Sequence, residues 1–122
     1  MARVLLIDDS PTERALITGW LSKHGYIAME AADAETGLAL AHQQKPDLVL
    51  MDIIMPGTNG FEATRKLRRS PATQTIPVVL ISSKSQPSDL AWGKKQGAAA
   101  YLTKPFTEAD LLHTLKQLVP QD

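Results

Sequence analysis

Short apolar runs alternate with longer amphipathic stretches along the whole chain. Runs rich in valine, isoleucine and leucine are typical of strands, and they are Val4–Ile7, Tyr26–Glu30, Leu48–Met51, Val78–Ile81 and Ala100–Leu102. The first, third and fourth runs are almost continuously apolar, as expected of strands that are buried on both faces. Because helical stretches separate the strands, the pattern predicts an α/β domain with a doubly wound, five-stranded parallel sheet.

Five helices are expected between and after these strands. Ser10, Pro11 and Glu13 predict the start of the first helix through a capping box, in which Ser10 is the N-cap and Glu13 stands at N3. Its apolar stripe comprises Leu16, Ile17, Trp20 and Leu21. The other helices are expected from Asp33 to about Gln43, from Asn59 or Gly60 to about Arg69, from Pro87 to Gln96, and from Thr107 to about Leu118.

Composition narrows the classes of partner. At 122 residues we expect one domain over positions 1–122 with no output domain, acting as a monomer. Lysine plus arginine total 13 and aspartate plus glutamate total 13, so the net charge gives no reason to expect nucleic acid. The absence of cysteine excludes disulfides and thiol nucleophiles. No apolar run suits a secretory signal or a membrane span, so we expect a cytoplasmic protein without a membrane partner.

Polar residues gather where the expected strands end. Asp8 and Asp9 follow the first strand, Asp52 follows the third, Ser82 follows the fourth and Lys104 follows the fifth. The carboxyl ends of parallel strands share one edge of the sheet, and ligands bind there near the point where the strand order reverses. We therefore expect these five side chains to lie close together.

The chemistry of this set favours phosphoryl transfer. Three clustered carboxylates repel one another unless a cation balances them, and oxygen ligands without histidine or cysteine suit Mg²⁺. Lys104 and the Ser82 hydroxyl are suited to contact phosphoryl oxygens, which leaves Asp52 as the nucleophile. Taken singly, Asp8 and Lys104 are also explained as helix or turn charges. Asp52 is harder to explain, because a lone carboxylate in an apolar run is costly.

Longer segments carry a family resemblance. In chain order they are Asp8–Asp9, Leu48–Gly60, Pro77–Ser82 and Tyr101–Phe106. This ordered set resembles the receiver domain of two-component response regulators over essentially the whole chain. The resemblance implies a flavodoxin-like (βα)5 fold with strand order 2-1-3-4-5.

The resemblance also implies a role for each matching residue. Asp52 corresponds to the phosphoacceptor, and Mg²⁺ is expected on Asp8, Asp9, Asp52 and the backbone carbonyl of Ile54. Ser82 and Tyr101 correspond to the switch residues, Lys104 corresponds to the lysine that contacts phosphate, and Pro105 corresponds to a cis proline. A histidine kinase is the implied donor. A downstream protein is the implied target, bound on the surface of the fourth helix, fifth strand and fifth helix.

Three further segments suggest a pathway. Asp9–Glu13, Lys23–Gly25 and Trp92–Ala98 resemble the small stand-alone regulators of chemotaxis-like pathways that govern type IV pili and twitching motility. We therefore expect a signalling protein whose chemistry is phosphotransfer and self-dephosphorylation, rather than an enzyme acting on a separate substrate. A phosphate sink and a degenerate docking module remain alternatives, although the complete set of site residues argues against degeneracy.

Two enzyme or carrier classes on similar sheets fit less well. An aspartate-nucleophile phosphatase requires Asp-x-Asp after the first strand, whereas Asp8 and Asp9 are adjacent. A flavodoxin-like electron carrier requires a phosphate loop rich in glycine and hydroxyls at that place. Ser10–Glu13 has no glycine and carries a negative charge.

Overall fold

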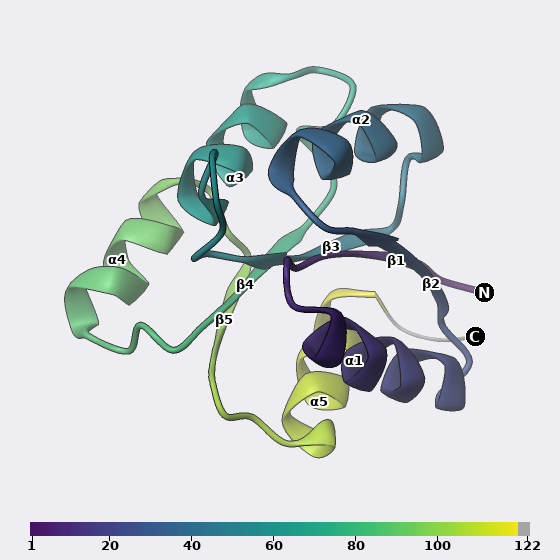
Figure 1. Ribbon diagram of the computed structural model, residues 1–122. Helices are drawn as coiled ribbons and strands as arrows, with labels where there is room; N and C mark the ends of the chain where they lie inside the picture. The colour runs from purple at the N-terminus through teal and green to yellow at the C-terminus, as the bar shows by residue number, and fades with distance from the viewer. Residues whose placement is uncertain (120–122) are drawn as a thin grey trace.

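Strands and helices alternate strictly along residues 1–119, the part of the chain described by the computed structural model (Figure 1). The strands are β1 (Arg3–Ile7), β2 (Ile27–Ala31), β3 (Leu48–Asp52), β4 (Val78–Ser82) and β5 (Ala100–Thr103). The helices are α1 (Pro11–Lys23), α2 (Ala34–Gln44), α3 (Gly60–Arg69), α4 (Pro87–Lys95) and α5 (Glu108–Leu118). Each expected element is present, with ends that differ by about one residue. Within residues 1–119 no helix is long and apolar enough to cross a membrane.

The five strands form one parallel sheet in the order β2-β1-β3-β4-β5, as predicted. Ile7 at the end of β1 pairs with Met51 in β3, and Asp52 pairs with Ile81 in β4. The chain leaves β1 toward one side of the sheet and β3 toward the other. The strand order therefore reverses between β1 and β3, so their carboxyl ends flank the crevice where ligands bind in such sheets.

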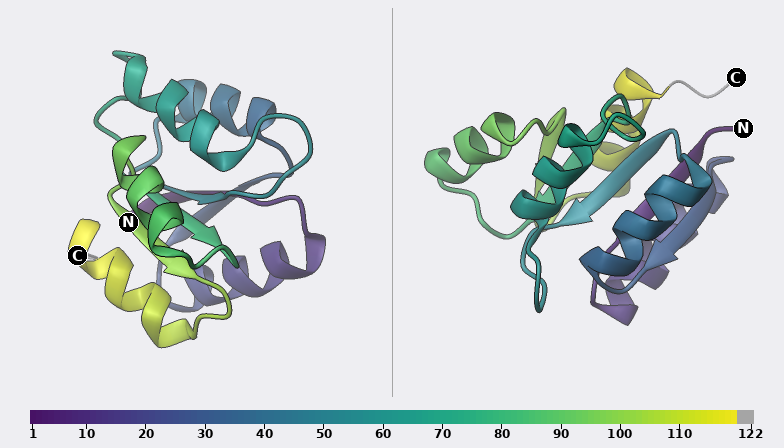
Figure 2. Two further views of the ribbon diagram at one scale, coloured as in Figure 1. Left: turned by 90° about the vertical axis from the view of Figure 1, so that its left-hand side faces the viewer. Right: turned by 90° about the horizontal axis from the view of Figure 1, so that it is seen from above.

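Alternating side chains of the strands point to opposite faces of the sheet and create two cores. One core packs α1 and α5 against the sheet, and its buried members include Leu6, Leu21, Leu50, Ile81 and Leu111. The other packs α2 and α3, and includes Leu5, Ala41, Met51, Leu67 and Leu80. The two layers of helices are separated by the sheet in Figures 1 and 2. Because β1, β3 and β4 are buried on both faces, they carry the nearly continuous apolar pattern of the sequence, unlike the edge strands β2 and β5.

The start of α1 corrects one detail of the expected capping box. Ser10 Oγ accepts from the Glu13 amide at 3.2 Å, as expected, but the reciprocal bond from the Ser10 amide to the Glu13 carboxylate is not formed. The Ser10 amide donates instead to Asp8 Oδ1 at 2.9 Å, and the Glu13 carboxylate pairs with Lys104. A cationic amine is a stronger partner for a carboxylate than a neutral amide, which accounts for the difference.

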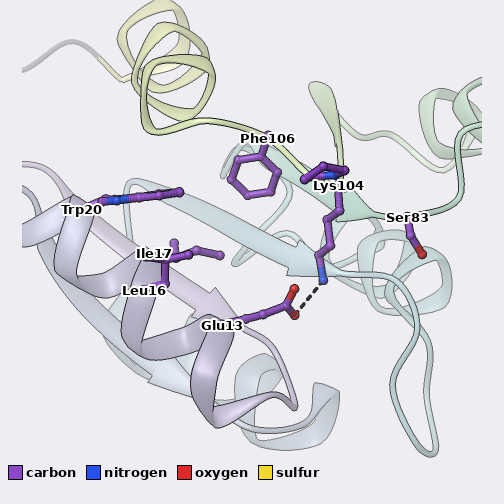
Figure 3. A pocket seen from close by; sticks show the side chains of 8 residues that line it. Glu13, Leu16, Ile17, Trp20, Ser83, Lys104 and Phe106 are labelled. Carbon is purple, nitrogen blue, oxygen red and sulfur yellow. Dashed lines mark hydrogen bonds and ion pairs between the residues drawn. The ribbon is translucent and has the colours of Figure 1, made fainter.

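The apolar stripe of α1 is narrower than the sequence indicates. Ile17 and Leu21 are buried, while Trp20 packs edge-to-face on Phe106 with ring centroids 6.2 Å apart. Leu16 is 53% exposed, which contradicts its expected inward position. It lies toward a groove beside α1 rather than under the helix (Figure 3).

Gly60 lets α3 begin directly against the end of β3. Its amide donates to the Ile53 carbonyl at 2.9 Å. A Cβ at this position would lie 2.8 Å from Ile53 Cα and would also overlap the Asp52 carbonyl oxygen. A residue with a side chain would therefore push α3 away from the backbone that carries Asp52.

We expect Gly60→Ala to lower the free energy of unfolding by about 1–3 kcal/mol, because backbone atoms must move to admit the methyl group. Gly19→Ala is the matched control: its Cβ would meet nothing within 4 Å, and alanine is better than glycine inside a helix by up to about 1 kcal/mol. Urea unfolding of both variants measures the two effects. Equal stabilisation by both substitutions would contradict the close approach at Gly60.

Candidate functional site

The expected site residues meet at the carboxyl edge of the sheet. Asp8 follows β1, Asp52 ends β3, and these strands are neighbours in the sheet. Ser82 ends β4 and Lys104 follows β5. Asp8 is fully buried, and Asp52 and Ser82 are nearly so. Burial removes the water that would otherwise solvate these polar groups, so they depend on one another and on bound cations.

Lys104 lies between two carboxylates. Its Nζ is 3.3 Å from Asp52 Oδ1 and 2.8 Å from Glu13 Oε2. Figure 3 shows the amine reaching from the end of β5 toward the first turn of α1. The Lys104–Pro105 peptide is cis, as the resemblance implied.

Asp8, Glu13 and Asp52 form a compact group of carboxylates. Each offers an oxygen, and the three oxygens lie within 4.8 Å of one another. Asp8 Oδ1 accepts from the Ser10 amide, whereas Oδ2 is buried without a hydrogen-bond partner. A buried carboxylate oxygen without a partner is costly, and a hard divalent cation would satisfy it. The residues present therefore fit Mg²⁺.

The other two expected ligands lie beside this group. Ile54 follows β3 at the same edge, and no hydrogen bond to its carbonyl oxygen is formed within residues 1–119. Asp9 is exposed and its carboxylate is not one of the three grouped oxygens. Ligation by Asp9 and by the Ile54 carbonyl therefore stays a prediction.

The charges at this edge shift one another's proton affinities. Burial raises the pKa of Asp8 to about 7, with the Ser10 amide opposing this shift and the Asp52 charge adding to it. Burial also raises the pKa of Asp52, while Lys104 opposes the rise. Burial lowers the pKa of Lys104, but Glu13 and Asp52 outweigh it and raise that pKa above its ordinary value. Without a metal ion, burial thus disfavours the charged form of Asp8 and Asp52, while the Lys104 amine stays protonated.

Ser82 and Tyr101 are joined through the backbone of one residue. The Lys84 amide donates to Ser82 Oγ at 3.1 Å, and the Tyr101 hydroxyl donates to the Lys84 carbonyl at 2.6 Å. Burial raises the pKa of Tyr101, so its hydroxyl keeps its proton and remains a donor. Any movement of the Ser82 hydroxyl therefore affects the loop after β4, whose Lys84 carbonyl accepts the hydrogen bond from Tyr101.

A groove of about 340 Å³ opens beside the site, between α1 and the segment that follows β5. Ile17, Trp20 and Phe106 line its apolar part, and the Glu13–Lys104 ion pair lies at its polar end (Figure 3). The groove is thus continuous with the edge that carries Asp52.

Comparison with known families identifies this arrangement. Residues 4–116 match the response regulator receiver domain. The chain belongs to this family. It is a signalling domain of two-component systems, and the match covers the elements from β1 to α5.

Individual relatives and structures agree with this assignment. The chain is 51% identical to Protein PilH of Pseudomonas aeruginosa, over 98% of each chain. It is 38% identical to the transcriptional regulator RpaA of Synechocystis, covering 49% of that protein. The structure superposes on the chemotaxis protein CheY4 of Vibrio cholerae with a TM-score of 0.92 and 33% identity, covering 98% of this chain and 99% of that one.

A further structural relative was solved with a metal ion. It is the receiver domain of the sensor histidine kinase PA1611 of Pseudomonas aeruginosa, with magnesium coordinated in its active-site cleft. The TM-score is 0.90 at 28% identity, with 98% of each chain covered. The likeness confirms the receiver fold.

Sequence reasoning missed Glu13 as a site residue. The capping-box pattern accounted for this glutamate locally, and nothing in that pattern pointed to Lys104, 91 positions away. One signal was available: a helix that begins directly after Asp8 and Asp9 must present its first turn at the same sheet edge. Glu13 at N3 therefore stood close to the expected phosphoryl site.

The raised pKa of Asp8 predicts a pH-dependent stability. The folded protein binds this proton more tightly than the unfolded chain does, so the free energy of unfolding should fall as pH rises from about 4 to about 7. Asp8→Asn should flatten that fall and stabilise the metal-free protein by roughly 2–4 kcal/mol above neutral pH.

Urea unfolding in the presence of a chelator, at about pH 5 and about pH 8, measures this difference. Asp9→Asn is the control because that carboxylate is exposed. A pH profile unchanged by Asp8→Asn would show that burial of Asp8 does not govern it.

Proposed function

We propose that this receiver accepts a phosphoryl group on Asp52 from the phosphohistidine of a histidine kinase. The observation that carries the proposal is the buried Asp52 carboxylate, which lies 3.3 Å from the Lys104 amine and beside the carboxylate of Asp8, one of whose oxygens has no hydrogen-bond partner. In the transfer, an Asp52 oxygen forms the new O–P bond as the P–N bond to the kinase histidine breaks. The electron pair of the broken bond stays on the imidazole nitrogen.

The residues near Asp52 divide the work of stabilising charge. Asp8, Asp9, Asp52 and the Ile54 carbonyl would hold Mg²⁺, which supplies positive charge to the phosphoryl oxygens. Lys104, after β5, would supply a second positive charge, and the Ser82 hydroxyl, at the end of β4, would donate to a phosphoryl oxygen. The partnerless Asp8 oxygen supports the cation, as does the magnesium reported for the PA1611 receiver.

Phosphorylation would be relayed through the loop after β4. If Ser82 turns its hydroxyl to a phosphoryl oxygen, it gives up the bond from the Lys84 amide. The Lys84 carbonyl then shifts, and Tyr101 loses its present acceptor and turns inward. These movements change the surface formed by α4, β5 and α5, which we propose binds the downstream protein.

A chemotaxis-like pathway that governs type IV pili and twitching motility is the setting we propose. Its support is the 51% identity to PilH over 98% of each chain, together with the segments Asp9–Glu13 and Trp92–Ala98. In this setting the protein is a cytoplasmic, monomeric response regulator. Its signal is protein binding rather than contact with nucleic acid or membrane.

The central test is labelling by a small phosphodonor with Mg²⁺. Wild-type protein should take up about one phosphoryl group per chain, whereas Asp52→Asn or a chelator should abolish the label. Intact mass spectrometry measures the label, and Asp47→Asn is a matched control because Asp47 lies just before β3 and binds the Arg3 amide. Equal labelling of the Asp52→Asn protein would refute the site.

Ile54 predicts slower loss of the phosphoryl group than in a variant with a hydrogen-bonding residue at position 54. The residue is 57% exposed beside the site, and its side chain has no polar atom to orient an attacking water. Ile54→Asn should therefore shorten the lifetime while leaving labelling intact, measured as phosphate release at fixed Mg²⁺. A lifetime that is unchanged or longer would show that position 54 does not control water.

A further inference from the structure

Lys104 is shared unequally between its two carboxylates. Its amine is nearer to Glu13, at 2.8 Å, than to Asp52, at 3.3 Å. The Lys104 side chain is 19% exposed and that of Glu13 is 39% exposed. The pair therefore lies at the mouth of the site, where attraction between charges is stronger than on an open surface and weaker than in the interior.

The Glu13 carboxylate is available for this contact because it does not cap the N-terminus of α1. The Ser10 amide, its expected partner, is taken by Asp8 Oδ1. The carboxylate of Glu13 is consequently held at the site by Lys104. It also lies within the same 4.8 Å group as the oxygens of Asp8 and Asp52.

We propose that Glu13 is a positioning residue that holds the Lys104 amine in the unphosphorylated protein and must give it up when Asp52 is phosphorylated. This inference rests on the function proposed above. In this exchange the Lys104 amine leaves the Glu13 carboxylate and binds the phosphoryl group on Asp52.

Charge decides the direction of the exchange. A phosphoryl group on Asp52 carries nearly two negative charges, whereas Glu13 carries one, so the amine moves toward phosphorus. The Glu13 carboxylate lies in the same group of oxygens as Asp52, so the new negative charge repels it. Before transfer, the energy of the Glu13–Lys104 pair has to be overcome, so Glu13 slows the gain of the phosphoryl group.

The first experiment removes the charge of Glu13 without changing its size. Glu13→Gln should be labelled by a small acyl phosphate about threefold to tenfold faster than wild type, and the gain should shrink as salt is raised. Glu13→Asp keeps the charge but shortens the arm, and should give a smaller gain. Glu62→Gln is the matched control: it too is the first-turn glutamate of a helix whose cap accepts from its amide.

A double-mutant cycle separates positioning from simple repulsion of the donor. In a Lys104→Ala background, Glu13→Gln should change the labelling rate by less than twofold, because the amine that Glu13 holds is absent. A gain of the same size in both backgrounds would overturn the proposal, since Glu13 would then act directly on the donor.

A measurement on metal-free, unphosphorylated protein stands apart from labelling. Nuclear magnetic resonance should show Lys104 ammonium protons that exchange slowly in wild type and faster in Glu13→Gln, with no change in Glu62→Gln. Equal exchange in all three would overturn the proposal whatever the labelling shows. Label persisting on Asp52→Asn would instead refute the proposed function, and the exchange result would still decide whether Glu13 holds Lys104.

Discussion

Carboxylates gathered at the buried edge of the sheet are the constraint on which the rest of this structure depends. Asp8 and Asp52 stand at the ends of neighbouring central strands, so the topology itself forces them together. The Lys104 amine pairs with Asp52 and with Glu13, and so offsets part of the negative charge of these carboxylates. The fold therefore gives up stability at this edge, where the function proposed above requires room for a cation and a phosphoryl group. The two apolar cores compensate with strands covered on both faces.

The positions of Asp52 and Lys104 could be predicted because they follow from strand ends. Once the apolar runs are recognised, parallel topology brings their carboxyl ends to one edge whatever the helices do. The fold and most of the site were readable for that reason. The partner of Glu13 was not, because a side chain at N3 has a local partner in the sequence and a distant one only in space. The Ser10 amide and the Lys104 amine both lay within reach of the Glu13 carboxylate, and the charged amine is the stronger partner.

Leu16 illustrates a second limit of sequence reasoning. Helical spacing places it next to Ile17 and Trp20, but periodicity gives only the direction of a side chain. Whether that direction meets the sheet depends on how α1 lies across it. Here Trp20 packs on Phe106 and is half-buried, whereas Leu16 is exposed at the groove. The contact between Trp20 and Phe106, 86 positions apart, is one that no local pattern encodes.

The two backbone hydrogen bonds of Lys84 have a consequence for how the receiver couples to a target. The amide of Lys84 donates to Ser82 and its carbonyl accepts from Tyr101, so the two peptide units that flank the Lys84 Cα couple these residues, and neither can reorient without cost to the other. Thermodynamic linkage then works in both directions. A target that prefers the inward Tyr101 would favour the Ser82 position suited to a phosphoryl group. A bound target would in that case stabilise the phosphorylated state that recruited it, so the lifetime of the signal would depend on the binding partner as well as on the receiver.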